Sequence, residues 1–307
     1  MSVGCVAGDG QSYIVFCDFF DRVLELYHKG YRRASTQRSD FNYDNLKGGD
    51  DFDSQYVTSC EVCVGRNVED FSFPPHCSRG ERRQLLSLAD KAFRQLSEEI
   101  PGTLVSLQQL AADRAQLGCV GLPVDTPSAA MLRTGVARDW PDARAVWISK
   151  DESLVVLINI EEHLQLISTR KDDNIKKAFE CVCTTLRKLE ELYKRLRHPF
   201  VWKDHLGYVL SSPAEVGTGL RASVRVALKH IQHHWQLGNI LDRLRLRLAH
   251  TGCAAGSVCE VFNAQTIGFT EVELLQFLVD GVKLLIVMDK TLGQPDGTID
   301  HLIPAHK

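Results

Sequence analysis

The sequence predicts an α+β fold in which a large antiparallel β-sheet is flanked by helices. Two observations predict this class. Short apolar segments rich in β-branched residues, typical of strands, occur at 143–147 and 154–160, whereas longer amphipathic segments, typical of helices, occur at 81–99 and 173–197. They are mixed along the chain without the strict alternation that parallel sheets require. At 307 residues and 44% apolar, the chain can build one large or two modest hydrophobic cores.

The first predicted element is a helix over 12–28, where apolar residues recur near helical spacing. We expect this helix to expose Phe16, Phe19 and Phe20, which must then dock on a partner subunit or on the chain's own surface. The polar stretch 30–55, rich in glycine and aspartate, is typical of a linker.

A helix and a hairpin are predicted next. The 81–99 segment has an apolar stripe at helical spacing. Segments 143–147 and 154–160 are separated by the turn-like residues 149–152, so we expect them to form an antiparallel hairpin.

The clearest helix of the chain is predicted over 173–197, because its apolar stripe is the longest. Segments 208–210 and 222–228 read as a further strand pair that flanks the Gly-Thr-Gly turn at 217–219. The last helix begins at Thr270, where Glu273 completes a capping box, and ends before Gly293.

Charge and hydropathy exclude several classes of function. The net charge of −3, from 36 basic and 39 acidic residues, provides no basic field for nucleic acid. The N-terminus lacks a basic region followed by an apolar core, which argues against a secretory signal. No apolar run approaches the ~20 residues that a membrane helix needs. We therefore expect a cytoplasmic protein that binds neither nucleic acid nor membrane.

Ten cysteines are scattered along the chain, and in an intracellular protein we expect them to be reduced thiols. Cys60 and Cys63 have the spacing of a redox or zinc pair, but no second such pair follows to complete a zinc site. His230, His233 and His234 could place two imidazoles on one helical face, although a solvated polar face is the simpler interpretation. We expect no metal site.

Five separated segments, with the order and spacing of one known family, carry the most specific signal. Together they resemble creatine kinase, a phosphagen kinase or ATP:guanidino phosphotransferase that moves a phosphoryl group between MgATP and a guanidine. The segments are Leu-Lys-Gly-Gly-Asp-Asp at 46–51, Pro-Pro-His-Cys-Ser-Arg-Gly-Glu-Arg-Arg at 74–83, Ala-Arg-Asp-Trp-Pro-Asp-Ala-Arg at 137–144, Gly-Thr-Gly-Leu-Arg at 217–221 and Val-Asp-Gly-Val-Lys-Leu at 279–284.

The resemblance implies a domain layout as well as a fold. Creatine-kinase-like enzymes carry a small all-helical domain before a catalytic domain whose antiparallel sheet holds the nucleotide. In this comparison the chain looks like a divergent, N-terminally shortened member. We expect residues 1–31 to be the remnant of the helical domain, 32–55 a linker and 56–307 the catalytic-type domain.

Phosphoryl transfer needs aligned reactants and positive charge around the moving group, which the family supplies with Mg²⁺ and five arginines. The resemblance implies that four of these arginines are replaced here, and that the loop after the last of them is about four residues shorter. The four replaced positions are Glu61, Cys63, Gln165 and Ala249.

Three residues remain as candidate nucleotide contacts by the same comparison. Arg221 is the arginine at the end of the Gly-Thr-Gly-Leu-Arg segment, where the family also has one. Ser59 is the first residue of the strand motif in which Glu61 and Cys63 replace two of the family's arginines. Glu260 matches an acidic position on the sugar side of the nucleotide. MgATP or MgADP is therefore the expected ligand by resemblance, held by a weakened set of contacts.

The guanidine side of the implied site is also altered. Glu161 matches the principal catalytic carboxylate, which would orient the guanidinium and take its proton. Ile160 replaces a neighbouring glutamate and Leu157 replaces an aromatic residue. Ser212, before Pro213, stands where the family has a reactive cysteine, and a serine hydroxyl cannot supply a thiolate's negative charge.

Magnitudes favour a loss of catalysis. At roughly 1.5–3 kcal/mol for each charged hydrogen bond, four missing arginines remove about 6–12 kcal/mol of stabilisation. Each 1.36 kcal/mol is about tenfold in rate. Arginines in the scaffold segments are retained while the ligand arginines are changed, which random decay would not produce. These retained arginines are Arg79, Arg82, Arg83, Arg138 and Arg144.

Two functions follow as hypotheses. The first is a catalytically degenerate creatine-kinase-like protein with a binding or structural role, in an oligomer with itself or with creatine-kinase-like subunits, or in a cytoskeletal assembly such as a flagellar axoneme. The second is an active creatine kinase, which would need new cations at the vacated positions. Lys47, Arg66 and Arg170 are nearest in sequence.

Overall fold

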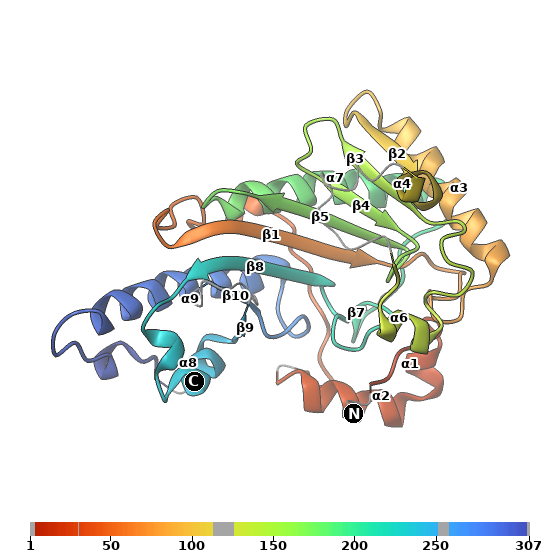
Figure 1. Cartoon of the computed structure of the whole chain (residues 1–307). Helices are drawn as coiled ribbons and strands as arrows, with labels where there is room; N and C mark the ends of the chain where they lie inside the picture. Colours follow the sequence, from red (N-terminus) through yellow and green to blue (C-terminus); the bar gives the residue numbers. More distant parts are fainter. Residues whose placement is uncertain (1–3, 30, 113–125, 251–257, 306–307) are drawn as a thin grey trace.

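The structure is a computed structural model that describes residues 4–29, 31–112, 126–250 and 258–305. Its centre is an eight-stranded sheet in which every neighbouring pair of strands is antiparallel, in the order β2-β3-β4-β5-β1-β8-β10-β9 (Figure 1). The predicted α+β class is confirmed. The strands are β1 Val57–Arg66, β2 Gly102–Ser106, β3 Ala145–Ser149, β4 Val155–Ile158, β5 Leu164–Arg170, β8 Leu220–Ala227, β9 Leu246–His250 and β10 Val258–Asn263.

Helices flank the sheet, and the ends of the longest follow local sequence signals. The predicted capping box is present at the start of α9, where Thr270 and Glu273 satisfy each other's backbone N–H groups. In the part of the chain that the structure describes, short 3₁₀ helices lie at Tyr43–Asn45, Ile231–His233 and Asp300–Leu302. The α-helices are α1 Ser12–Val15, α2 Cys17–Tyr27, α3 Arg79–Gln95, α4 Leu107–Ala112, α6 Ala129–Thr134, α7 Ile175–Arg195, α8 Leu237–Leu244 and α9 Glu271–Leu292.

The central strand β1 separates two faces of the sheet, because successive side chains of a strand point to opposite sides. Cys60, Val62 and Val64 are buried in the main core with side chains of α7 and α9, such as Phe179 and Leu278. We call this side the helix-covered face. The alternate residues of β1, which are Ser59, Glu61 and Cys63, are only half-buried and define the open face.

Part of the open face is closed by a second apolar cluster. Leu107 and Leu110 of α4 pack there against Val146, Leu157 and Ile167 from strands β3, β4 and β5. The uncovered part of the open face therefore lies over β1, β8, β10 and β9.

The predicted N-terminal helix is present but divided. Phe16 has φ −110° and ψ 34°, which separates α1 from α2. Tyr13, Phe20 and Leu24 are buried in a small cluster of the chain's own loops, whereas Phe16 and Phe19 are 60% and 54% exposed. The expectation of an exposed Phe20 was wrong, because the helix docks on its own chain through this side.

The predicted pairing of segments 208–210 and 222–228 was also wrong. A short strand β7 (Gly207–Tyr208) pairs with β6 (Trp202–Lys203), and β8 pairs with β1 and β10. The Gly-Thr-Gly segment between them does not form a hairpin, because the Thr218 N–H donates to the carbonyl of Thr266 at 2.8 Å. The hairpin predicted from 143–160 is confirmed as β3–β4.

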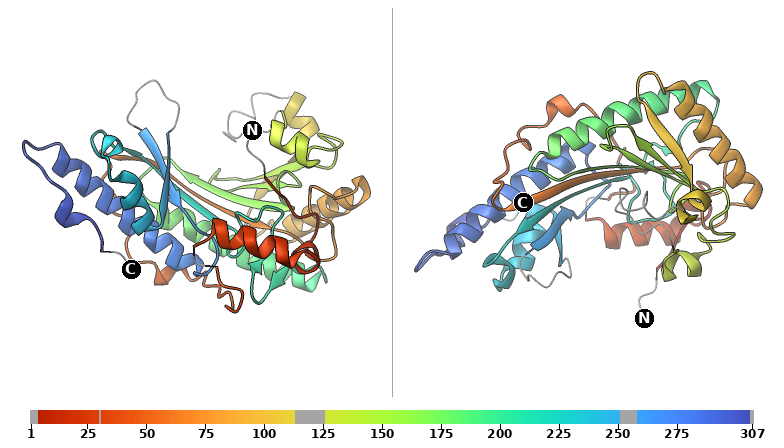
Figure 2. Two further views of the ribbon diagram at one scale, coloured as in Figure 1. Left: turned by 90° about the horizontal axis from the view of Figure 1, so that it is seen from below. Right: turned by 45° about the horizontal axis from the view of Figure 1, so that its top comes forward.

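Figure 2 shows the strands as one curved, twisted layer, with the long helices beside it. Within the ranges that the structure describes, no helix combines the length and the apolar character that crossing a membrane would need.

Candidate functional site

Strand register brings the predicted site residues together on the open face. Cys63 lies between Arg221 of β8 and Ile167 of β5. Two residues earlier along β1, Glu61 lies between Ser223 and Thr169. The positions that the sequence comparison treated as parts of one site are thus neighbours across three strands.

The same face continues onto β10 and β9. Glu260 pairs with Arg225 of β8 on one side and with Ala249 of β9 on the other, and Arg225 in turn faces Ser59. The Arg221 guanidinium lies 4.7 Å from the ring centre of Phe262. The shortened loop predicted after Ala249 falls at 251–257, which lies outside the described residues.

Glu61 places a carboxylate in the middle of this face. Its Oε2 accepts a hydrogen bond of 3.0 Å from Thr169 Oγ1, and within the described part of the chain it forms no ion pair. An ionised carboxylate here repels any phosphate that lies across the sheet.

Gln165 cannot replace a cation. Its side chain is buried, and its Nε2 lies 3.4 Å from Oε2 of Glu161, to which it donates. Its Oε1 is buried without a hydrogen-bond partner among the residues described. A buried amide oxygen presents partial negative charge, so it adds nothing that would hold a phosphate.

Glu161 lies exposed in the loop between β4 and β5, at the edge of the open face. The charge of Glu161 acts on Glu215, a residue that the sequence analysis missed. Burial, and then the charge of Glu161, raise the pKa of Glu215 to about 7, while Arg221 opposes the shift. Glu215 could have been identified from the sequence, because it lies in the short segment between the two site candidates Ser212 and Arg221.

Ser212 is held beside the site by a buried carboxylate rather than by its own side chain. Glu162 accepts hydrogen bonds from Ser211 N at 2.9 Å, Ser211 Oγ at 2.6 Å and Asn67 Nδ2 at 2.5 Å. Burial raises the pKa of Glu162 to about 8. The network fixes the 211–212 backbone against β5, which is a structural role.

Apolar side chains fill the region where the resemblance places the guanidine. Leu157 and Ile160 are both buried in the second apolar cluster. Cys63 borders the same cluster, and burial, followed by the charge of Glu215, raises the pKa of its thiol. This thiol is therefore neutral at physiological pH and supplies no charge.

The three cations that were nearest in sequence do not fill the vacated positions. Arg66 is fully buried and stacks at 3.4 Å from the ring centre of Tyr208. Arg170 faces Cys60 in the ladder, so it lies on the helix-covered face, where it pairs with Asp172 at 2.9 Å. Lys47 lies beside α9, where its backbone N–H donates to Gln276.

Two other arginines do lie on the open face, and the sequence analysis did not single them out. Arg225 is exposed and has no ion pair within the described ranges. Arg247 pairs with Phe262 in the ladder, and its Nη1 donates to the hydroxyl of Tyr27 at 2.8 Å. Strand alternation was the missing signal, since it was not applied to β8 and β9.

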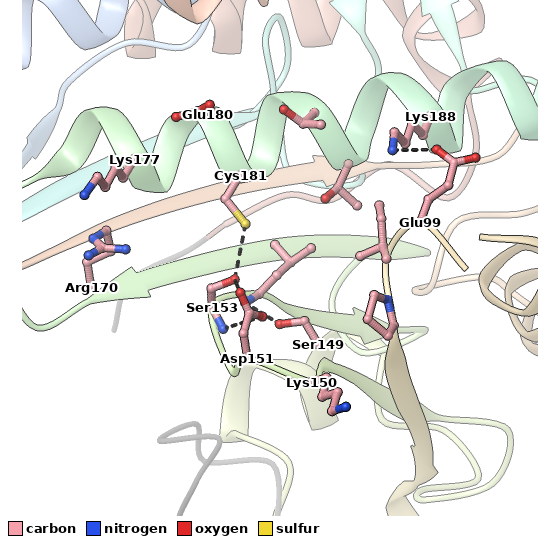
Figure 3. A pocket seen from close by; sticks show the side chains of 15 residues that line it. Glu99, Ser149, Lys150, Asp151, Ser153, Arg170, Lys177, Glu180, Cys181 and Lys188 are labelled. Atoms are coloured by element: carbon pink, nitrogen blue, oxygen red, sulfur yellow. Dashed lines mark hydrogen bonds and ion pairs between the residues drawn. The ribbon is translucent and has the colours of Figure 1, made fainter. Parts of the chain in front are cut away.

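A cavity of about 840 Å³ lies elsewhere, on the helix-covered side between α7 and the β3–β4 turn (Figure 3). Lys188 and Glu99 form an ion pair of 2.6 Å at one end, and the Cys181 thiol points toward Ser153, 3.6 Å from its Oγ. None of the predicted site residues lines this cavity, so it is separate from the open face.

Metal-ligand geometry is not found in the described ranges, where no three His, Cys, Asp or Glu side chains gather as a metal site. Cys60 and Cys63 point to opposite faces of β1 and cannot act as a pair. His233 ends a short 3₁₀ helix rather than lying on an α-helical face.

Comparisons with known proteins identify the family of the chain. The family model described as ATP:guanido phosphotransferase, C-terminal catalytic domain, matches residues 84–292, and the N-terminal domain model matches residues 1–25. The chain is 45% identical to creatine kinase M-type from Sus scrofa and from Gallus gallus over 313 residues, which is 100% of this chain and 82% of each relative.

Solved structures with the same fold are also kinases of guanidino compounds. A crystal structure of lombricine kinase superposes with a TM-score of 0.90 at 34% identity, covering 99% of this chain and 85% of the other. The substrate-free duplicated taurocyamine kinase from Schistosoma mansoni gives a TM-score of 0.87 at 25% identity, covering 99% of this chain and 44% of the other.

Proposed function

The chain belongs to the ATP:guanido phosphotransferase family, and from this premise we propose that it is a catalytically degenerate member whose fold serves a binding or structural role. The observation that carries the proposal is the charge of the open face. Glu61 occupies its centre, and Cys63, Gln165 and Ala249 supply no cation where the family resemblance implies arginines.

The chemistry explains why this matters. Transferring a phosphoryl group depends on positive charge that is already in place around the group as it moves. Arg221 could contact one phosphate from β8. Cys63 pairs with Arg221 in the ladder, and Glu61 lies two residues before Cys63 on β1, so Glu61 would repel the same phosphate. Alignment alone cannot offset that loss, because the missing hydrogen bonds sum to about 6–12 kcal/mol.

The guanidine side supports the same proposal. Glu161 remains exposed and could orient a guanidinium. The buried apolar side chains of Leu157 and Ile160 occupy the neighbouring space and offer that cation no hydrogen bond. Ser212 adds an uncharged hydroxyl.

An active creatine kinase using MgATP is the alternative, and two observations favour it. Glu161 and Arg221 are both exposed, and the charges of both act on the pKa of Glu215. Arg225 and Arg247 add cations that the sequence comparison did not count. In this alternative, Glu161 takes the guanidine proton and the arginines hold the phosphates.

Phosphoryl transfer between MgATP and creatine tests the proposal directly. We expect no turnover above background, and no change in Glu161→Gln. The matched control is Glu191→Gln, an exposed glutamate on α7 that is remote from the open face. Turnover that disappears in Glu161→Gln but persists in Glu191→Gln would establish the alternative and overturn our proposal.

A non-catalytic role acts through partners. We propose creatine-kinase-like subunits, a second copy of this chain or a cytoskeletal or axonemal assembly, in the cytoplasm. We also propose the domain division 1–31, 32–55 and 56–307. It is supported by the middle segment, whose described residues contain only the 3₁₀ helix Tyr43–Asn45.

A further inference from the structure

The open face carries an excess of negative charge around Cys63. Burial raises the pKa of this thiol, and the charges of Glu215, Glu61 and Glu161 raise it further. Arg221 acts on it in the opposite sense. Three carboxylates against one guanidinium leave an excess of two negative charges when all four groups are ionised. The family resemblance places phosphates on this face, but this balance of charge suits a cation.

The acids are spread along β1, which lies beside β8 in Figure 1. Glu61 and Cys63 share one side of the strand, and Gly65, two residues further, pairs with Gln165 of β5. The Glu161 carboxylate lies at that end, because Gln165 Nε2 donates to it at 3.4 Å. At about 3.3 Å per residue, the strand from Glu61 to Gly65 extends over roughly 13 Å. This spread fits an elongated ligand that carries more than one charge.

Glu215 belongs to the same group of acids. Its backbone N–H donates to the carbonyl of Ser212 at 3.0 Å. The Ser212 N–H donates in turn, at 3.4 Å, to Glu162, the sequence neighbour of Glu161. These bonds fix the segment that carries Glu215 beside the loop that carries Glu161.

The acids have no compensating cation in the described part of the chain. There, none of Glu61, Glu161 and Glu215 forms an ion pair. The hydrogen bonds that Glu61 and Glu161 accept come from a hydroxyl and an amide, which are neutral. Arg221 lies instead over the ring of Phe262, 4.7 Å from its centre. A bound cation would therefore meet carboxylates that are still free to pair with it.

Gln165 adds a buried acceptor that points to the same kind of ligand. Its side chain is 6% exposed, and its Nε2 faces Glu161. Its Oε1 is consequently left without a donor among the residues described. A buried amide oxygen without a partner is costly. A ligand with both N–H donors and positive charge can satisfy this oxygen and the neighbouring carboxylate together.

We propose that the open face binds a linear polyamine, whose ammonium groups pair with Glu61 at one end and with Glu161 and Glu215 at the other. The charges of such a chain are spaced along its length, as the acids are along β1. The methylene groups between them can lie on Cys63, whose thiol is neutral. The inference rests on the proposed function, because nucleotide phosphates would occupy the same face.

Glu215 gives this binding a pH dependence. Burial, followed by the charge of Glu161, raises the pKa of Glu215 to about 7, and Arg221 opposes the shift. Cys63 stays neutral, and Glu162, with a pKa raised by burial to about 8, is mostly neutral below pH 7. An ammonium group favours the ionised form of Glu215. Binding should therefore release a proton and become tighter as the pH rises from about 6 to about 7.5.

Isothermal titration of the full chain with spermidine, at low ionic strength and about pH 7.5, is the test. We expect spermidine to bind about tenfold or more tightly than butylamine, because the monoamine reaches only one end of the acidic group. Glu61→Gln should remove this preference. Glu191→Gln, an exposed glutamate on α7, is the matched control and should preserve it.

Proton release tests the part played by Glu215. Titrations in buffers of different ionisation enthalpy count the protons released on binding, and the release should vanish in Glu215→Gln. A structural role for Glu215 would weaken binding without changing the number of protons. Release that persists in this variant would overturn the site as proposed.

Three other results would also overturn the proposal. Spermidine could show no saturable binding, or butylamine could bind as tightly as spermidine. Glu191→Gln could weaken binding as much as Glu61→Gln, which would reduce the effect to general surface charge. Turnover in the phosphoryl-transfer assay would count against the proposed function, whereas absent turnover together with absent spermidine binding would refute this inference alone.

Discussion

Reversing the charge of Glu61 is the sharpest test of why the open face is a poor phosphate site. Glu61→Arg replaces a carboxylate at the centre of the face by a guanidinium. The wild-type side chain is half-buried, and among the described residues its hydrogen-bond partner is Thr169 Oγ1. The longer side chain can therefore extend over the face without disturbing the core. It would then lie between Ser223 and Thr169, within reach of a phosphate held by Arg221.

The magnitude follows from two contributions. A new charged hydrogen bond to phosphate contributes about 1.5–3 kcal/mol, and removing the repelling acid adds on the order of 1 kcal/mol. At about 1.4 kcal/mol for each tenfold change in affinity, and allowing for partial exposure to solvent, we expect the MgADP dissociation constant to fall by roughly tenfold to a hundredfold.

Isothermal titration with MgADP measures this change, and Glu61→Gln separates its two contributions. Removing the acid alone should improve binding only a few-fold. If Glu61→Arg binds MgADP no more tightly than Glu61→Gln, positive charge at this position does not limit binding, and the electrostatic argument fails.

Two further predictions concern stability. His28 is buried with a pKa lowered by burial to about 4, although its Nε2 bonds the carbonyl of Pro213 at 2.9 Å. The folded state therefore binds fewer protons than the unfolded state between about pH 4 and 6.5, and stability is lost as pH falls through that window. We expect the loss of unfolding free energy between pH 7 and 5, measured by urea denaturation, to be about 2 kcal/mol smaller in His28→Gln; an equal loss would contradict the assignment. Arg66→Lys should destabilise the fold by about 2–3 kcal/mol, because an ammonium group cannot reproduce the planar stack on Tyr208. The exposed Arg94→Lys should change stability by less than about 0.5 kcal/mol, and a similar change in both variants would refute the stacking argument.

Local signals in the sequence were sufficient for elements with regular periodicity. The amphipathic stripes at 81–99 and 173–197 predicted α3 and α7, with ends displaced by a few residues because helix termini depend on caps. The capping box at Thr270 fixed the start of α9. Strand pairing could not be read in the same way, since β8 pairs with β1 across more than 150 residues of chain.

The sequence predicted which family positions belong to the site, but not which other charged residues lie next to them. The sequence comparison named Glu61 and Gln165, and the ladder places both on or beside the open face. It missed Glu215 and Arg225, because a charged residue that the family lacks can be assigned to the site only when the side of the sheet on which it lies is known. Strand register supplied that information for Arg225, and the effect of the Glu161 charge on the pKa of Glu215 supplied it for Glu215.

The apolar cluster beneath β3 and β4 makes the altered site hard to reverse. Ile160 is buried there with Leu157, in space that the family resemblance assigns to polar and aromatic groups. Restoring a glutamate at Ile160 would now place an ionised carboxylate among hydrocarbon side chains, at a cost of several kcal/mol. A variant that restores only this glutamate, without polar neighbours to receive it, is therefore expected to be less stable than the present protein.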